Sequence, residues 1–83
     1  MTKAKLIEKL NKMFPKLNAV DGALFDDNSS NGIWFRGTEE TFIDSQYLIN
    51  DSYEVHPKFE ALLHEAGWFG EPYDKGTLLA FED

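Results

Sequence analysis

Apolar residues at helical spacing open the chain and predict an amphipathic helix, because they fall on one stripe of a 3.6-residue period. The stripe comprises Leu6, Ile7, Leu10, Met13 and Phe14. Thr2 is a suitable N-cap, and Pro15 disfavours helical geometry at Phe14, so we expect the helix to end near there. Its lysines lie opposite the stripe. Such a basic helix binds membranes or calmodulin-like grooves, or packs on a sheet, and we favour packing.

Residues 19–37 predict a β-hairpin, because the segments AVDGALF and GIWFRG flank the turn-forming cluster DDNSSN. Three strand-forming residues, Ile33, Trp34 and Phe35, follow one another. Since consecutive strand residues point to opposite faces, either Trp34 or the pair Ile33 and Phe35 must face away from the main core. One large apolar group is then available for a partner or a covering element.

The segment TEETFIDSQYLINDSYEV supports two interpretations. Thr38 followed by Glu39 and Glu40 resembles a capped helix start with acids at the positive end of the dipole. TFIDSQYLI also fits a strand. We favour a strand or irregular strand over Thr41–Ile49, followed by a turn at residues 50–52.

A second helix is predicted from about Pro57 to Ala66. Proline suits the first helical position, and Gly67 stands where a C-terminal cap favours positive φ. The apolar stripe of this helix comprises Phe59, Leu62, Leu63 and Ala66.

The segments WFGEPYD and TLLAFE predict a closing hairpin across Asp74, Lys75 and Gly76. Pro72 cannot donate to a strand ladder, which places the strand Trp68–Tyr73 at a sheet edge. The predicted order is α-β-β-(β)-α-β-β. We therefore expect an α+β fold in which two helices pack on one face of a small antiparallel sheet of four to five strands. A chain of 83 residues is too short for two cores, so we expect a single domain over residues 1–83.

The composition contains no cysteine, which excludes disulfides and thiolate metal sites and fits a reducing compartment. The opening MTKAKLIEKLNK interrupts every apolar run with a charge, unlike a signal peptide or a membrane span. We expect a cytoplasmic protein.

Charge is distributed unevenly along the chain. Residues 1–16 hold five lysines and one acid, a net of +4, whereas residues 17–83 hold three cations and fourteen acids, a net of −11; together these give −7. The negative electrostatic potential of residues 17–83 repels nucleic acid and attracts basic proteins, and salt weakens both effects. The alternative is that the acidity only keeps the protein soluble.

Catalytic and metal signatures are weak. The sequence has neither a cysteine nor the nucleophile-elbow glycine pattern that nucleophilic catalysis would use, and only His56 and His64 could act as bases. Glu60 and His64 stand one helical turn apart, with His56 before them, but this spacing is common on polar faces. Residues 27–38 match only the start of a calcium loop and end in Thr38, not glutamate. We expect no catalytic residue, metal or cofactor.

A binding surface remains as the favoured function. Carboxylates in predicted turns and at strand ends can take the place of nucleic-acid phosphates, and aromatic residues can act as anchors. The candidate partner-binding residues are Asp26, Asp27, Trp34, Glu39, Glu40, Asp44, Asp51, Glu54, Trp68, Glu71, Tyr73 and Asp74.

With its C-terminal LLHEAGWFGEPYDKGTLLAFED, the chain resembles the small acidic proteins encoded by bacteriophages. The shared features are a short, cysteine-free, aromatic-rich domain in which a helix precedes a PYDKGTLL hairpin. No residue role is carried over. The resemblance implies blocking of host defences, such as CRISPR effectors or restriction enzymes, by covering a nucleic-acid site.

We therefore expect a non-enzymatic, anti-CRISPR or anti-restriction type inhibitor that binds a basic host protein in the host cytoplasm, as a monomer or homodimer, with no direct nucleic-acid or membrane contact. One alternative is a small-ligand enzyme or sequestering protein that uses His56 and His64. Another is a self-associating phage structural or assembly subunit that pairs through the edge strand near Trp68.

Overall fold

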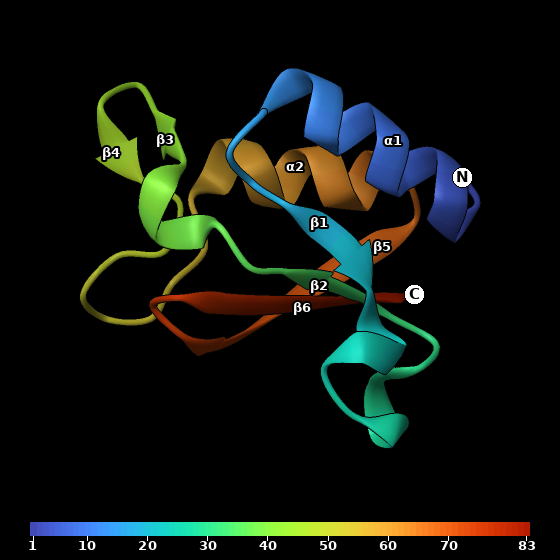
Figure 1. Ribbon diagram of the computed structural model, residues 1–83. Coiled ribbons are helices and arrows are strands. Elements are labelled where there is room, and N and C mark those ends of the chain that lie inside the picture. The colour runs from blue at the N-terminus through green and yellow to red at the C-terminus, as the bar shows by residue number, and fades with distance from the viewer.

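The computed structural model describes residues 1–83 and confirms the α+β class. Helices α1 (Lys3–Met13) and α2 (Pro57–Glu65) lie on the same side of a four-stranded antiparallel sheet (Figure 1). In spatial order the strands are β1 (Ala19–Asp21), β2 (Ile33–Phe35), β6 (Thr77–Glu82) and β5 (Trp68–Asp74). Neither helix is long and apolar enough to cross a membrane.

The core lies between the helices and the inner face of this sheet. Ile33 pairs with Ala80, and Phe35 pairs with Leu78, so these four side chains share one face. The buried cluster that they build with the helices comprises Leu6, Leu10, Leu17, Ala19, Ile33, Phe35, Leu48, Ile49, Phe59, Leu63, Trp68, Leu78 and Ala80. This single cluster therefore contains residues of both helices and of all four strands of the sheet.

Helix α1 begins and ends where its sequence predicts. The Thr2 hydroxyl accepts a hydrogen bond from the Lys5 N–H at 3.4 Å. At the other end, the helix ends at Phe14, whose N–H donates to the Leu10 carbonyl at 2.9 Å. The predicted apolar stripe is wrong at one position: Met13 is 46% exposed, because it stands at the margin of the stripe in the last turn of the helix.

The β1–β2 hairpin is confirmed, although its strands are short. Residues 22–31 instead form two 3₁₀ turns, Gly22–Leu24 and Asp27–Ser29, on the side of the sheet away from the helices (Figure 1). Trp34 points to this outer face, while Ile33 and Phe35 are buried on the inner face. The chain covers the tryptophan itself, because the Phe25 ring packs edge-on against it with 5.2 Å between ring centroids.

The segment after β2 differs from the strand or irregular strand predicted over Thr41–Ile49. It forms a 3₁₀ turn (Thr38–Glu40) and then a separate two-stranded hairpin of β3 (Phe42–Ile43) and β4 (Gln46–Tyr47). The two turn residues, Asp44 and Ser45, have φ values of 53° and 66°. Positive φ at both positions matches the right-handed twist of a tight hairpin, which reverses the chain where the apolar pattern suggests continuation.

Helix α2 has the predicted caps. Pro57 occupies the first turn, His56 Nδ1 accepts from the Lys58 N–H at 3.1 Å, and Gly67 follows the helix with φ of 85°. In the hairpin that follows, Asp74 pairs with Thr77, so the loop contains two residues rather than the predicted three, and the register shifts between Pro72 and Asp74. β5 lies at the sheet edge, as predicted.

Trp68 corrects one expectation about the surface. It was predicted as an exposed anchor on the edge strand, but it is only 1% exposed. Its indole N–H donates to the Met1 carbonyl at 3.1 Å, so the start of the chain covers the ring. Trp68 is a core residue and offers nothing to a partner.

Candidate functional site

The candidate binding residues divide between two separate regions. Trp34, Glu71 and Tyr73 belong to the outer face of the sheet, next to the covering segment that holds Asp26 and Asp27. The other acids lie on the 3₁₀ turn after β2, the β3–β4 hairpin, the loop after β4 and the β5–β6 turn; they are Glu39, Glu40, Asp44, Asp51, Glu54 and Asp74. The second region brings together more of the exposed carboxylates.

On the outer face, aromatic contacts within the chain occupy the predicted anchors. Phe25 packs edge-on against both Trp34 and Tyr73, with centroid distances of 5.2 and 5.3 Å. The Arg36 guanidinium lies 5.3 Å from the Trp34 ring centre. Trp34 is half-buried, and its indole nitrogen is buried without a hydrogen-bond partner. This tryptophan therefore mainly holds residues 22–31 on the sheet.

The β3–β4 hairpin presents two aromatic residues that are not among the site residues predicted from the sequence. Phe42 and Tyr47 pair across the strands, with ring centroids 4.8 Å apart, and are 52% and 49% exposed. The turn at Asp44 and Ser45 places residues 42 and 47 opposite each other on one face, but it contains no glycine or asparagine, so the sequence holds no strong signal for this pair.

Each ring lines a separate hollow beside the hairpin. A hollow of about 330 Å³ lies between Phe42, Glu40 and the end of α1 at Met13. A second, of about 350 Å³, lies between Tyr47 and the following loop, with Asp51 and Glu54 among its lining residues. We call Glu39, Glu40, Phe42, Tyr47, Asp51 and Glu54 the hairpin surface.

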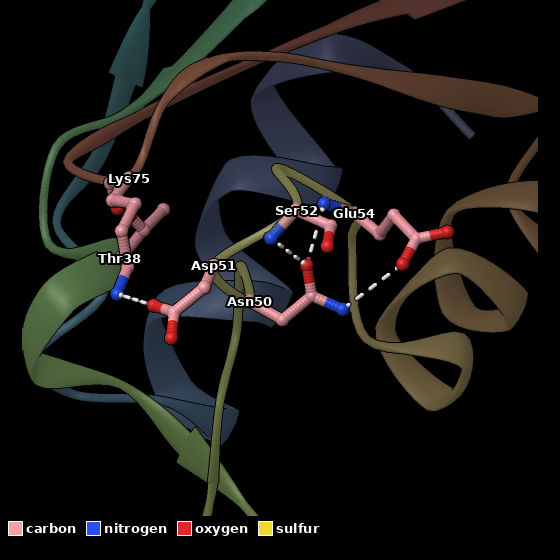
Figure 2. Close-up of polar contacts among 6 residues, drawn as sticks. All are labelled: Thr38, Asn50, Asp51, Ser52, Glu54 and Lys75. Atoms are coloured by element: carbon pink, nitrogen blue, oxygen red, sulfur yellow. Dashed lines mark hydrogen bonds and ion pairs between the residues drawn. The ribbon is translucent and has the colours of Figure 1, made fainter.

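Hydrogen bonds fix the segments that carry this surface (Figure 2). The buried Thr38 hydroxyl donates to the Lys75 carbonyl at 2.6 Å, which ties the 3₁₀ turn to the β5–β6 turn. Asn50 organises the neighbouring loop: its Oδ1 accepts from the N–H groups of Ser52 and Glu54 at 2.9 and 3.0 Å. Its Nδ2 donates to the Glu54 carboxylate at 3.1 Å. The acids of the hairpin surface therefore project from an ordered backbone.

Lys75 reaches into the acidic region from the β5–β6 turn. Its ammonium forms an ion pair with Asp51 and lies 5.0 Å from the centre of the Tyr47 ring. The hydrogen bond with Asp51 raises the pKa of Lys75, and the negative charges of Asp51 and Glu39 add to this effect. The same hydrogen bond lowers the pKa of Asp51. Both groups are held in their charged forms.

Asp44 is neutralised within the chain. Its carboxylate forms an ion pair with Lys58 at 2.5 Å, which connects the hairpin turn to the first turn of α2. The hydrogen bond to Lys58 lowers the pKa of Asp44, and the lysine charge lowers it further. Lys58 already occupies the Asp44 carboxylate, so the hairpin surface does not include Asp44.

The two histidines do not converge on a common site. His56 uses Nδ1 to cap α2, whereas His64 Nε2 lies 3.2 Å from Glu60 on the exposed side of the helix. No group of three or more His, Cys, Asp and Glu side chains is arranged to hold a metal ion.

Comparisons with models of known protein families, with curated proteins and with solved structures found no match to this chain.

Proposed function

We propose that this protein is a non-enzymatic inhibitor that binds a basic, nucleic-acid-handling protein through the hairpin surface. One observation carries the proposal: the half-exposed Phe42–Tyr47 pair stands among carboxylates of which Glu39, Glu40 and Glu54 form no ion pair within the chain. Exposed rings provide apolar area to bury, and unpaired carboxylates provide charge for a basic partner.

The chemistry of the surface favours a site that normally binds phosphates. Arginine and lysine side chains that bind a nucleic-acid backbone also bind carboxylates, by the same charge-assisted hydrogen bonds. The chain from residue 17 onward carries a net charge of −11, from three cations and fourteen acids, which steers such a partner towards it. Together with the resemblance to small acidic phage proteins, this leads us to propose a CRISPR effector or restriction enzyme in the cytoplasm of a bacterial host as the target.

The first experiment is affinity capture of bacterial proteins on the purified domain, at low and then high salt, with mass spectrometry of the retained proteins. A retained nuclease or CRISPR effector is then purified and tested for loss of nucleic-acid binding in the presence of the domain. We expect capture to weaken with salt and nucleic-acid binding to be inhibited.

The decisive variants reverse charge at the hairpin surface: Glu39→Lys, Glu40→Lys and Glu54→Lys in one chain. A matched control reverses three exposed acids elsewhere, Glu65→Lys, Glu82→Lys and Asp83→Lys, and changes the net charge equally. The proposal predicts that the first variant loses at least about tenfold in affinity and the second much less. Equal losses would show that net charge alone drives capture, and unchanged affinity in both would reject the acidic interface.

A further inference from the structure

We propose that Tyr53 is an anchor residue of the interface with the basic partner, and that its ring becomes buried only in the complex. This inference rests on the proposed function and adds one aromatic side chain to the residues through which the hairpin surface binds.

The backbone of Tyr53 adopts a left-handed conformation, with φ of 60°. Contact between Cβ and the backbone disfavours this region for residues other than glycine, and asparagine and aspartate tolerate it best among the rest. The other non-glycine residues with positive φ are small and polar: Asn18, Asp44 and Ser45. Tyr53 is therefore the one bulky side chain in this conformation, at a position where asparagine or glycine would be less strained.

Hydrogen bonds within the loop impose this conformation. The Tyr53 N–H donates to the Asn50 carbonyl at 3.0 Å, and the Asn50 N–H donates to the Glu54 carbonyl at 3.0 Å. The Asn50 side chain also accepts from the N–H groups of Ser52 and Glu54, on either side of Tyr53. Because the backbone is held on both sides, the strain at Tyr53 belongs to the folded structure.

No contact within the chain uses the Tyr53 ring. The residue is 54% exposed, and its ring forms no aromatic or cation–π contact. Every other aromatic residue either contacts another ring or, in the case of Trp68, lies in the core. Neither packing nor loop geometry therefore explains a tyrosine at this position. Strained residues of this kind are concentrated at binding sites.

The neighbours of Tyr53 connect it to the hairpin surface and favour a basic partner. Tyr53 lies between Asp51 and Glu54, which both belong to that surface. The Glu54 carboxylate accepts from the neutral Asn50 amide and forms no ion pair. A cationic surface attracted to Glu54 therefore meets an exposed ring, which provides apolar area to bury and a face that attracts cations. Tyrosine is also among the residues that most often dominate binding at protein interfaces.

The test uses the purified protein that the affinity capture retains, and measures its affinity for the wild type and three variants. Tyr53→Asn removes the ring and relieves the backbone, so it should weaken binding at least about tenfold. The same substitution should raise the melting temperature by roughly 2–6 °C. Tyr53→Phe keeps the ring and should stay within about threefold of the wild type. The matched control is Tyr73→Asn, which removes a 65% exposed ring outside the hairpin surface and should change affinity by less than about twofold.

Unchanged affinity of Tyr53→Asn, or an equal loss in Tyr73→Asn, would overturn the anchor. A lower melting temperature of Tyr53→Asn would show that the fold itself uses the ring and would also overturn it. If the anchor fails while the triple charge reversal still weakens binding, the proposed function stands without Tyr53. If capture retains no nucleic-acid-handling protein, or the charge reversal has no effect, the proposed function is rejected and the anchor with it.

Discussion

The side-chain amide of Asn11 forms two hydrogen bonds with the backbone of Ala19. Its Oδ1 accepts from the Ala19 N–H at 2.8 Å, and its Nδ2 donates to the Ala19 carbonyl at 3.0 Å. Ala19 begins β1, an edge strand with no neighbour on that side. The helix therefore supplies, through one residue, a donor and an acceptor like those of an adjacent strand.

Replacing this amide should destabilise the protein. Asn11→Leu leaves an N–H and a C=O of the buried Ala19 without partners, at an expected cost of about 1–3 kcal/mol in unfolding free energy. Asn11→Asp keeps the acceptor and should cost less. Urea denaturation measures both, and a cost for Asn11→Leu below that for Asn11→Asp would contradict this role.

Thr38 is expected to hold the β5–β6 turn through its hydroxyl. Thr38→Val retains the shape but leaves the Lys75 carbonyl without its donor, and should cost about 1 kcal/mol. Amide hydrogen exchange at Gly76 should accelerate. Thr38→Ser keeps the hydroxyl and serves as the control, because its exchange rate at Gly76 should stay nearer to that of the wild type.

Phe59 and Phe42 should separate stability from binding. Phe59 is fully buried and packs edge-on against Phe14 and Phe35, at centroid distances of 5.8 and 5.5 Å. Phe59→Ala should lower the unfolding free energy by about 3–5 kcal/mol. Phe42→Ala removes a half-exposed ring and should change stability far less while weakening partner capture. Comparable stability losses would place Phe42 in the core instead.

His56 should matter for helix stability, whereas His64 should not. His56→Ala removes the α2 cap and should cost about 1 kcal/mol, while His56→Asp restores a capping acceptor. His64→Ala alters an exposed position and should stay within about 0.5 kcal/mol. Neither substitution should abolish partner capture if the protein does not act through a histidine. Loss of function in both variants with stability preserved would support the small-ligand alternative.

The Lys75–Asp51 pair should give stability a dependence on acid pH. The pKa of Asp51 is lower in the folded protein than its ordinary value of 3.8. The stability that Asp51 contributes is therefore complete above pH 3.8 and is lost as the pH falls through the folded-state pKa. Because Asp51 is 94% exposed, solvent screens most of this contribution, so Asp51→Asn should be only slightly less stable than the wild type near neutral pH and should approach it in acid. Lys75→Met breaks the same pair from the other side and should follow the same profile. A difference from wild type that is constant with pH would exclude this pair as its source.

The elements with local signals were predictable. A threonine cap, a proline and a glycine at helix ends and an apolar stripe determine α1 and α2, and Pro72 indicates an edge strand without knowledge of the rest of the fold. The β3–β4 hairpin escaped prediction because Asp44 and Ser45 turn the chain without a glycine, in a conformation that few residues adopt.

The candidate site was predictable in composition but not in arrangement. Exposed acids follow from polarity in turns, whereas the neutralisation of Asp51 by Lys75 depends on a contact across 24 positions of the chain. The burial of Trp68 depends on the Met1 carbonyl, 67 positions away. Contacts of that kind are set by the packed fold and leave no pattern in a short window of sequence.

The position of β6 has a consequence for synthesis of the protein. This strand lies between β2 and β5, yet Thr77–Glu82 follows both of them in the sequence. While a ribosome is still making the preceding residues, β2 lacks its partner on that side, and Ile33 and Phe35 lack the opposing Ala80 and Leu78. The sheet can close only after residue 82 has left the exit tunnel, so a nascent chain that stalls before that point exposes an unpaired, apolar strand to chaperones and to aggregation.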